Sequence, residues 1–226
     1  MQGRRASLGR RAGPDLQEDD PTARAFLEIY EGNLWGSSET VSGPGSERTY
    51  AAGLAAALPA LFKAHSISSV FDAPCGDLNW MRGVVAKTGV DIVAPLIARL
   101  APLQGKRMQL AVGDIRRMEF PPADLWICRD CWFHLSYADI AATMERFLAS
   151  ATPYILTTSH INDGTFANAD CSTGGFRLID LFSPPFGFPR EALASIDDWV
   201  APWPPRRMHL WHRAQLARAV SNLGAV

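Results

Sequence analysis

The sequence of 226 residues lacks any run of about 18 or more apolar residues, so it offers no segment suited to span a membrane. No apolar stretch follows its early arginine pairs, which argues against a secretory or twin-arginine signal. Cysteine is also scarce, with only Cys75, Cys128, Cys131 and Cys171. We therefore expect a cytoplasmic protein with free thiols, in which the Cys128-x-x-Cys131 pair lacks the second ligand pair of a zinc site.

The sequence also lacks an excess of either charge. It has 22 Lys and Arg against 23 Asp and Glu, with a formal net charge of −1. Nucleic-acid-binding domains are usually basic, so no nucleic-acid partner is expected. A hydrophobic fraction of 47% is ordinary for a globular protein, and the length suits one α/β domain with a large core.

Three regions follow from the distribution of apolar residues. Residues 1–22 show no periodicity and are expected to form a disordered tail. Residues 23–66 form a predicted N-terminal helical cap, with helices near 22–30 and 47–64 and a kink or break at Pro59. Residues 67–226 are predicted as the main domain. Within it, an irregular insertion at about 160–205 is expected to contact the substrate.

Strand and helix patterns alternate through the main domain. Strands are predicted at 69–72, 90–92, 108–112, 124–128, 154–158 and 207–211. Helices are predicted near 79–86, 95–101, after the capping residue Ser136, and at 214–220. This alternation predicts an α/β fold with a doubly wound, mostly parallel sheet.

The loop after the first strand, Ala73-Pro74-Cys75-Gly76-Asp77, lacks the glycines of a dinucleotide site. Such a site needs Gly-x-Gly-x-x-Gly, because the pyrophosphate lies against bare backbone at a helix start. Here only Gly76 is present, and Asp77 would place a carboxylate near any phosphate. The loop favours a ligand with an adenosine, no phosphate and a cationic end, a description that fits S-adenosylmethionine.

Acidic residues follow four successive predicted strands. Ligands of open α/β sheets bind at the carboxyl ends of the strands, where Asp72, Asp91, Asp114 and Asp130 are expected. Asp91 comes 19 residues after Asp72, close to the spacing at which an acid binds ribose hydroxyls. The pattern predicts a ligand site at this edge of the sheet.

Three motifs carry a family resemblance: Ser42–Ser46 (SGPGS), Asp72–Met81 (DAPCGDLNWM) and Cys128–Ser136 (CRDCWFHLS). With them the chain resembles class I S-adenosylmethionine-dependent methyltransferases, and most of all a bacterial branch of that family. The resemblance implies a Rossmann-like methyltransferase fold in a single domain. It also implies contacts to the cofactor: the methionine moiety and ribose at Asp72, Ala73, Cys75 and Gly76; the ribose hydroxyls at Asp91; the adenine at Asp114 and Ile115; and the region of the sulfonium at Arg129 and Asp130.

Candidates for acceptor chemistry lie later in the chain. His134 and His160 are the candidate bases, because an imidazole titrates near neutral pH, and Asp130 is placed to orient His134. Arg177 is a candidate to bind acceptor carboxylates or hydroxyls, and Phe186 and Phe188 are candidate walls of an acceptor pocket. Each has a plainer alternative, as a packed histidine, a surface arginine or core aromatics.

The predicted function is methyl transfer to a small molecule or glycan, with O-methylation expected. An NAD(P)-dependent oxidoreductase, an RNA methyltransferase and a non-catalytic binding module remain as alternatives. No metal is expected, since the sequence has no clear ligand cluster, although Asp130 and Asp163 could both face the acceptor. The oligomeric state is not readable from the sequence.

Overall fold

The structure, a computed structural model, describes residues 20–83 and 86–217. Within these residues, seven strands form one sheet in the order β3-β2-β1-β4-β5-β7-β6. They are β1 (Ser69–Asp72), β2 (Ala86–Asp91), β3 (Met108–Val112), β4 (Leu125–Cys128), β5 (Tyr154–His160), β6 (Ala194–Asp197) and β7 (Arg206–His212). The pairs from β3 to β5 are parallel, and β7 is antiparallel to both of its neighbours. The predicted α/β fold with a mostly parallel sheet is confirmed.

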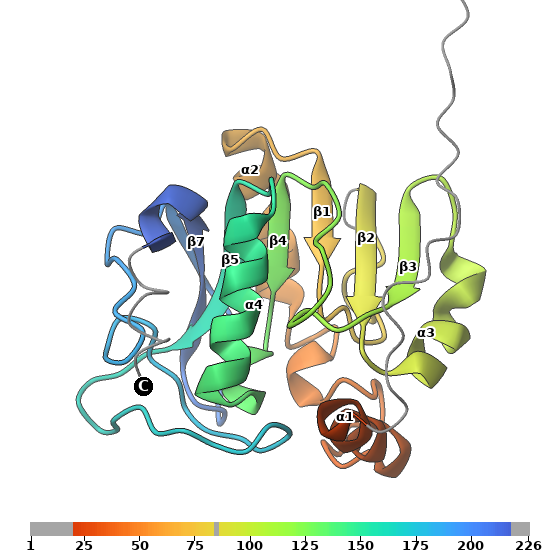
Figure 1. The fold of residues 1–226 in the computed structure, drawn as a ribbon, viewed down its shortest axis with the longest axis horizontal. Helices are drawn as coiled ribbons and strands as arrows, with labels where there is room; N and C mark the ends of the chain where they lie inside the picture. Colours follow the sequence, from red (N-terminus) through yellow and green to blue (C-terminus); the bar gives the residue numbers. More distant parts are fainter. Residues whose placement is uncertain (1–19, 84–85, 218–226) are drawn as a thin grey trace, which may run out of the picture.

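Helices cover both faces of the sheet (Figure 1). On one face lies α4 (Tyr137–Ala149), which buries Ile140, Met144 and Phe147. On the other face lie α2 (Ala52–Ala64) and α3 (Ala94–Leu100). Successive strand residues point to opposite faces, so Val70 packs in the α2 cluster while Phe71 packs in the α4 cluster.

The N-terminal region places α1 (Pro21–Gly32) beneath the carboxyl ends of the strands, at the bottom of Figure 1. Asp20 caps this helix by accepting hydrogen bonds from the amides of Thr22 and Ala23. Residues 20–22, which were predicted to belong to a disordered tail, therefore form the start of α1. Residues 1–19 of the predicted tail lie outside the described residues. The segment between α1 and α2 includes the short 3₁₀ helix η1 (Pro44–Ser46).

Several element predictions differ from the structure. The predicted helix at 79–86 is wrong: turns run to Gly83, and Ala86 already begins β2. β2 is therefore longer than the strand expected at 90–92. Pro59 does not break α2, which is one continuous helix. The predicted terminal helix at 214–220 is helical over residues 213–217, and the rest of it lies outside the described residues.

The insertion at 160–205 contains the edge strand β6, which its composition did not signal. It also packs on the α4 face of the sheet, because Ile179, Leu181, Phe186 and Phe188 belong to the same core cluster as the α4 residues. This segment is thus partly structural. Among the described residues, no helix is both long and apolar enough to cross a membrane.

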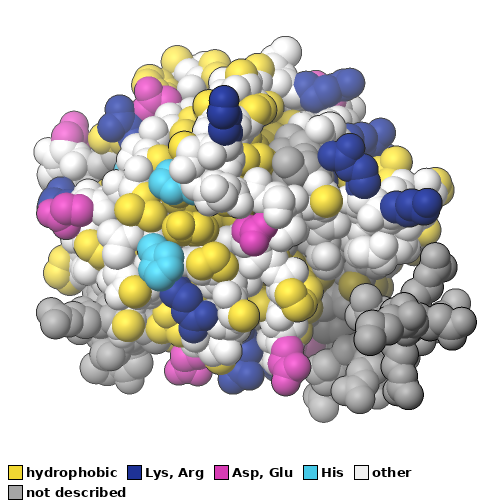
Figure 2. Space-filling view, turned by 90° about the horizontal axis from the view of Figure 1, so that it is seen from above, with side chains coloured by type: hydrophobic (Ala, Val, Ile, Leu, Met, Phe, Trp, Pro, Cys, Tyr) yellow, Lys and Arg dark blue, Asp and Glu magenta, His cyan; other side chains and the backbone are white. Residues whose placement is uncertain are grey.

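The two ends of the strands differ in character. At the amino ends, seen in Figure 2, basic, acidic and histidine side chains are scattered among apolar ones. At the carboxyl ends, the loops after β1, β2, β3 and β4 lie next to α1 (Figure 1). Residues of these loops and of α1 line a cavity.

Candidate functional site

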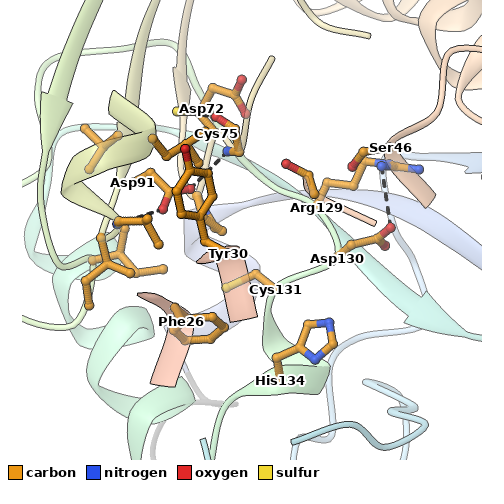
Figure 3. Close-up of a pocket in the computed structure, with 18 of the residues that line it drawn as sticks. Phe26, Tyr30, Ser46, Asp72, Cys75, Asp91, Arg129, Asp130, Cys131 and His134 are labelled. Carbon is orange, nitrogen blue, oxygen red and sulfur yellow. Dashed lines mark hydrogen bonds and ion pairs between the residues drawn. The ribbon is translucent and has the colours of Figure 1, made fainter. Parts of the chain in front are cut away.

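The cavity is lined mainly by residues that follow the parallel strands. Figure 3 shows Asp72 and Asp91 on one side, Arg129 and Asp130 on the other, and Tyr30 of α1 between them. The apolar lining includes Phe26, Tyr30, Ile92, Val93, Leu96 and Ile115. The cavity therefore joins a side suited to an aromatic base and a sugar with a side that carries arginine, aspartate and His134.

The backbone amides of the loop after β1 donate hydrogen bonds within the protein. Ala73 N donates to Ile127 O (3.1 Å), Cys75 N to Val90 O (2.8 Å), Gly76 N to Asp91 Oδ2 (3.0 Å) and Asp77 N to the Ser42 hydroxyl (3.0 Å). The described residues after this loop also form turns, with no helix start. A phosphate needs free amides at a helix N-terminus, so the loop is poorly suited to a pyrophosphate.

Asp77 does not line the cavity. Its carboxylate accepts hydrogen bonds from the Thr40 hydroxyl (2.8 Å) and the Val41 amide (3.3 Å). These contacts fasten the segment before η1 to the first loop, and that segment places Val41 and Ser42 against the cavity. Asp77 thus builds the wall of the site.

Asp72, at the end of β1, carries the feature that best fits a cationic ligand. Its side chain lines the cavity, is 4% exposed, and Oδ2 is buried without a hydrogen-bond partner among the described residues. Burial raises the pKa of Asp72 to about 7, with Lys87 opposing the shift and Asp91 adding to it. A cation beside Oδ2 would satisfy this oxygen and favour the ionised form.

Asp91 and Asp114 are also buried at the cavity, and each is held in place. Asp91 accepts from the amides of Gly76 (3.0 Å) and Val93 (3.0 Å), while burial raises its pKa. Asp114 accepts hydrogen bonds from Arg116 Nε (2.9 Å) and Nη2 (2.7 Å). Each Asp91 oxygen therefore retains a lone pair for a ligand hydroxyl, whereas the two Asp114 oxygens already accept four hydrogen bonds from Arg116.

On the other side, Arg129 and Asp130 belong to a buried ionic network. Arg129 donates from Nε and Nη2 to Asp198 (2.8 and 2.9 Å), and its Nη2 also donates to Gly45 O (2.7 Å). Arg206 donates to Asp130 Oδ2 (2.7 Å) and to the Tyr50 hydroxyl (2.6 Å). Burial alone would raise the pKa of Asp130, but Arg129 and Arg206 outweigh it and lower the pKa.

Gly45 of the Ser-Gly-Pro-Gly-Ser motif lies where this network is tightest. A Cβ at this position would come within 2.8 Å of both Arg206 Nη2 and Asp130 Oδ2. The η1 backbone therefore lies close to the paired side chains, and a Cβ at position 45 would displace the Arg206–Asp130 pair. The sequence did not predict that Arg206, Asp198 and Tyr50 belong to the site. Each is remote in the chain from the residue that it contacts there.

His134 lines the cavity, half-buried, at the end of the 3₁₀ helix η3 (Trp132–His134). Its Nδ1 lies 2.7 Å from Gly175 O, and its ring stacks on Trp35 with centroids 5.1 Å apart. The expected orienting role of Asp130 is not observed, because Asp130 is engaged by Arg206 and Thr158. Burial lowers the pKa of His134, which keeps the imidazole neutral.

His160, the last residue of β5, is 4% exposed and is not among the residues that line the cavity. The Ile179 amide donates to its Nδ1 (3.1 Å). Burial, with a contribution from Arg206, lowers the pKa of His160 to about 4. A neutral ring of such low basicity is poorly suited to take up a proton, so the geometry does not support a base at His160.

The three predicted acceptor contacts lie away from the cavity lining. Phe186 and Phe188 are 0% and 3% exposed and pack in the core on the α4 face, so the structure does not place them as pocket walls. Arg177 lies over the Tyr137 ring (5.1 Å), and its Nη1 is 2.5 Å from Cys171 Sγ. Cys75 and Cys131 line the cavity as thiols, and Cys128 is fully buried.

No cluster of three or more His, Cys, Asp or Glu side chains that could hold a metal occurs within residues 20–83 and 86–217. Asp130, which could have faced the acceptor together with Asp163, is instead paired with Arg206 and Arg129.

Comparison with known proteins identifies similar folds but no close relative. No protein-family model matches the chain, and no curated protein matches it. The magnesium protoporphyrin IX methyltransferase of Synechocystis PCC 6803, crystallised with S-adenosylhomocysteine, superposes with a TM-score of 0.61 at 11% identity over 86% of this chain and 100% of that one. An S-adenosylmethionine-dependent methyltransferase of Leishmania major gives 0.63 at 15% identity, over 84% and 82% of the two chains. The chain has a methyltransferase fold.

A third solved structure agrees. The methyltransferase domain of the bacterial protein CtHen1 gives a TM-score of 0.52 at 15% identity, over 72% of this chain and 99% of that domain. At such low identities the likeness concerns the fold. The predicted Rossmann-like methyltransferase architecture is thereby confirmed.

Proposed function

We propose that the protein is an S-adenosylmethionine-dependent methyltransferase that acts on a hydroxyl group of a small-molecule acceptor. The observation that carries the proposal is a single cavity that joins the unpartnered carboxylate oxygen of Asp72 to the neutral imidazole of His134. One end suits a cationic amino-acid group, and the other suits removal of a proton.

The residues fit the cofactor part by part. Asp72 would bind the ammonium group, beside Ala73, Cys75 and Gly76 of the first loop. Asp91 would bind the ribose hydroxyls, and Ile115 would pack against the adenine among the apolar side chains of the cavity, next to Asp114, whose carboxylate is held by Arg116. Arg129 holds Gly45 and Asp198 in place at the opposite wall. When bound, the cofactor supplies a methyl group activated by its sulfonium.

The chain's own contribution to the chemistry is positioning and proton removal. Since Gly175 O can only accept a hydrogen bond, the proton of His134 lies on Nδ1 and the lone pair on Nε2. This lone pair can take the hydroxyl proton of the acceptor. Stacking on Trp35 fixes the plane of the imidazole. Asp130, held by two arginines, is a fixed negative charge at the same wall.

Thermal-shift and calorimetric titrations of the purified protein test the proposal. S-adenosylhomocysteine should stabilise the protein and bind to it, whereas NADPH should do neither, because the first loop has no free amides for a pyrophosphate. Stabilisation by NADPH without any effect of S-adenosylhomocysteine would favour the oxidoreductase alternative and overturn the proposal. Mass spectrometry of small molecules released on denaturation would then search for the acceptor.

A further inference from the structure

Arg177 is a positive charge that no carboxylate neutralises. Within residues 20–83 and 86–217, no Asp or Glu oxygen forms an ion pair with its guanidinium inside 4.0 Å. The polar contact of Nη1 is with the thiol of Cys171, at 2.5 Å, and a thiol is a weak hydrogen-bond partner. Since a guanidinium keeps its charge at every physiological pH, this group is expected to attract a negative charge.

One edge of the same guanidinium lacks hydrogen-bond acceptors. Arg177 Nε and Nη2 are both buried, and neither has a partner in the described part of the chain. These two nitrogens share an edge of the planar group and donate in parallel, an arrangement that matches two oxygens of a carboxylate or phosphate. Buried donors without acceptors are unfavourable, so this edge is suited to an oxyanion supplied by a ligand.

Tyr137, the first residue of α4, adds a third donor. The guanidinium lies over its ring, with Arg177 Cζ 5.1 Å from the ring centroid. Tyr137 is 9% exposed, and its hydroxyl is buried with no hydrogen-bond partner among the described residues. Burial raises the pKa of this hydroxyl, which therefore stays protonated. Two side chains in contact thus present three buried donors without acceptors.

The carboxylates of the neighbouring segments bind other groups. Asp170 Oδ1 accepts from the backbone amides of Tyr137 (2.8 Å) and Cys171 (2.9 Å). Asp139, in the first turn of α4, forms an ion pair with Arg116 (3.0 Å). Neither carboxylate reaches the guanidinium, so the protein supplies the donors of an oxyanion site without supplying the anion.

The contact lies below the surface and away from the cavity. Neither of its two side chains is among the residues that line the cavity. Arg177 and Cys171 are half-buried, and the adjacent Phe176 is exposed. Residues 161–193 contain turns but no helix or strand. A small acid can therefore reach the guanidinium by displacing loop residues, without breaking a helix or the sheet.

The segment that carries Arg177 also holds the candidate base. Its amide donates to Phe133 O (3.1 Å), and the Gly174 amide donates to His134 O (2.8 Å). Gly175 O lies 2.7 Å from His134 Nδ1. An anion bound by Arg177 would thus fasten the segment that orients the imidazole.

We propose that Arg177 and Tyr137 form an oxyanion-binding site, separate from the cofactor cavity, that takes the carboxylate of a small acid. The carboxylate would accept from Arg177 Nε and Nη2 together and from the Tyr137 hydroxyl. Phosphate offers the same oxygen geometry, but it carries about 1.5–2 negative charges near neutral pH. The single positive charge of this site matches the single charge of a carboxylate.

The test follows the Arg177 Nε–H signal of the unmodified protein by ¹H–¹⁵N NMR. Sodium acetate is titrated against sodium chloride at constant ionic strength, and inorganic phosphate is titrated in a second series. Acetate should move the signal downfield along a saturable curve and should bind more tightly than phosphate. Absence of a saturable shift with both anions would overturn the site, and tighter binding of phosphate would overturn its assignment to a carboxylate.

Variants then separate the paired donors from charge alone. Arg177→Lys keeps the charge but loses the parallel donors, so acetate affinity, read from backbone amide shifts, should fall at least about tenfold. Tyr137→Phe should lower it about fivefold, the effect of one hydrogen bond. Arg190→Lys is the matched control, because Arg190 lies over the Phe182 ring at 5.6 Å but is exposed, and it should leave the affinity unchanged.

An acetate affinity in Arg177→Lys equal to that of the unmodified protein would contradict the proposal. The titration of the unmodified protein decides the question even where a variant does not fold. It also needs no cofactor, so its outcome is independent of whether S-adenosylhomocysteine binds.

Discussion

The two halves of the site are built in different ways. In the half formed after β1, β2 and β3, the contacts that hold Asp91 join residues close in the chain: Gly76 lies 15 positions from it and Val93 two. In the half formed by β4 to β7, Arg129 meets Asp198 across 69 positions and Arg206 meets Tyr50 across 156. Local contacts can be inferred from strand-loop patterns, whereas remote ones depend on the finished fold.

The largest expected effect concerns the core beneath the acceptor half. Phe186 is fully buried and meets the Tyr137 ring edge-on at 5.4 Å. Phe186→Ala should therefore lower the free energy of unfolding by about 3–5 kcal/mol, measured by urea denaturation. Phe176→Ala is the matched control, because Phe176 is exposed and its loss should change stability by less than about 0.5 kcal/mol.

An unchanged stability in Phe186→Ala would mean that this loop is not part of the core, and would restore Phe186 as a candidate pocket wall. Should the alanine variant not fold, Phe186→Leu replaces it with an expected loss below about 1.5 kcal/mol.

The difference between local and remote contacts also explains which parts of the fold and the site could be predicted from the sequence. The strand at 108–112, the acids at strand ends and the mostly parallel sheet follow from apolar patterns and turn residues. Phe186 and Phe188 were predicted as pocket walls but lie in the core. An aromatic residue in a proline-rich loop has the same sequence pattern in either position. The helix expected at 79–86 was wrong, since the turns there are stabilised by Asp77 and by contacts of Asn79 with Glu39 and Ser46, remote in the chain.

The tautomers of the two histidines could not be predicted either. Sequence identifies His134 and His160 as imidazoles, but the backbone groups of Gly175 and Ile179 fix their tautomers. Those groups are in the irregular insertion, where periodicity carries no information. For the same reason, the sequence did not predict that Gly175 O, 41 positions from His134, orients the imidazole in place of Asp130.

The next effect tests the cofactor half. Asp72→Asn keeps the shape of the side chain but removes the negative charge at the unpartnered oxygen. Because a charge-assisted hydrogen bond contributes about 1.5–3 kcal/mol, the affinity for S-adenosylhomocysteine should fall roughly 10- to 100-fold in calorimetry. Asp124→Asn is a suitable control, since Asp124 binds Ser68 and Ser69 at the amino end of β1. Equal affinity in Asp72→Asn and the unmodified protein would remove Asp72 from the site.

A third prediction concerns pH and the same carboxyl group. Its pKa of about 7 in the folded protein is above its ordinary value of 3.8, so the folded state holds a proton that the unfolded chain releases. The contribution of Asp72 to stability is thus fully present below about pH 4 and is lost as pH rises to about 7. Cofactor binding has the opposite dependence, because the ionised form binds the cation.

Affinity for S-adenosylhomocysteine should therefore rise with pH and level off above about pH 7, changing by up to about tenfold per pH unit below that point. Calorimetry in two buffers of different ionisation heat should detect release of a proton on binding near neutral pH. In Asp72→Asn this release should disappear. A pH dependence that persists in that variant would assign the titration to another group, with Asp91 next to be examined.

The smallest effect separates the two acids of the first loop. Asp77 is buried like Asp72, but its carboxylate binds Thr40 and Val41 of the chain and does not line the cavity. Asp77→Asn should weaken the attachment of the segment that carries Val41 and Ser42, at a cost of about 1 kcal/mol in unfolding free energy. Affinity for S-adenosylhomocysteine should fall only a few-fold, because the segment with Val41 and Ser42 is less firmly held while Asp72 still binds the ligand. The pH dependence of the affinity should be unchanged. A loss of affinity as large as that in Asp72→Asn, together with loss of proton release, would show that Asp77 binds the ligand itself and that the local half of the site is not organised as its hydrogen bonds indicate.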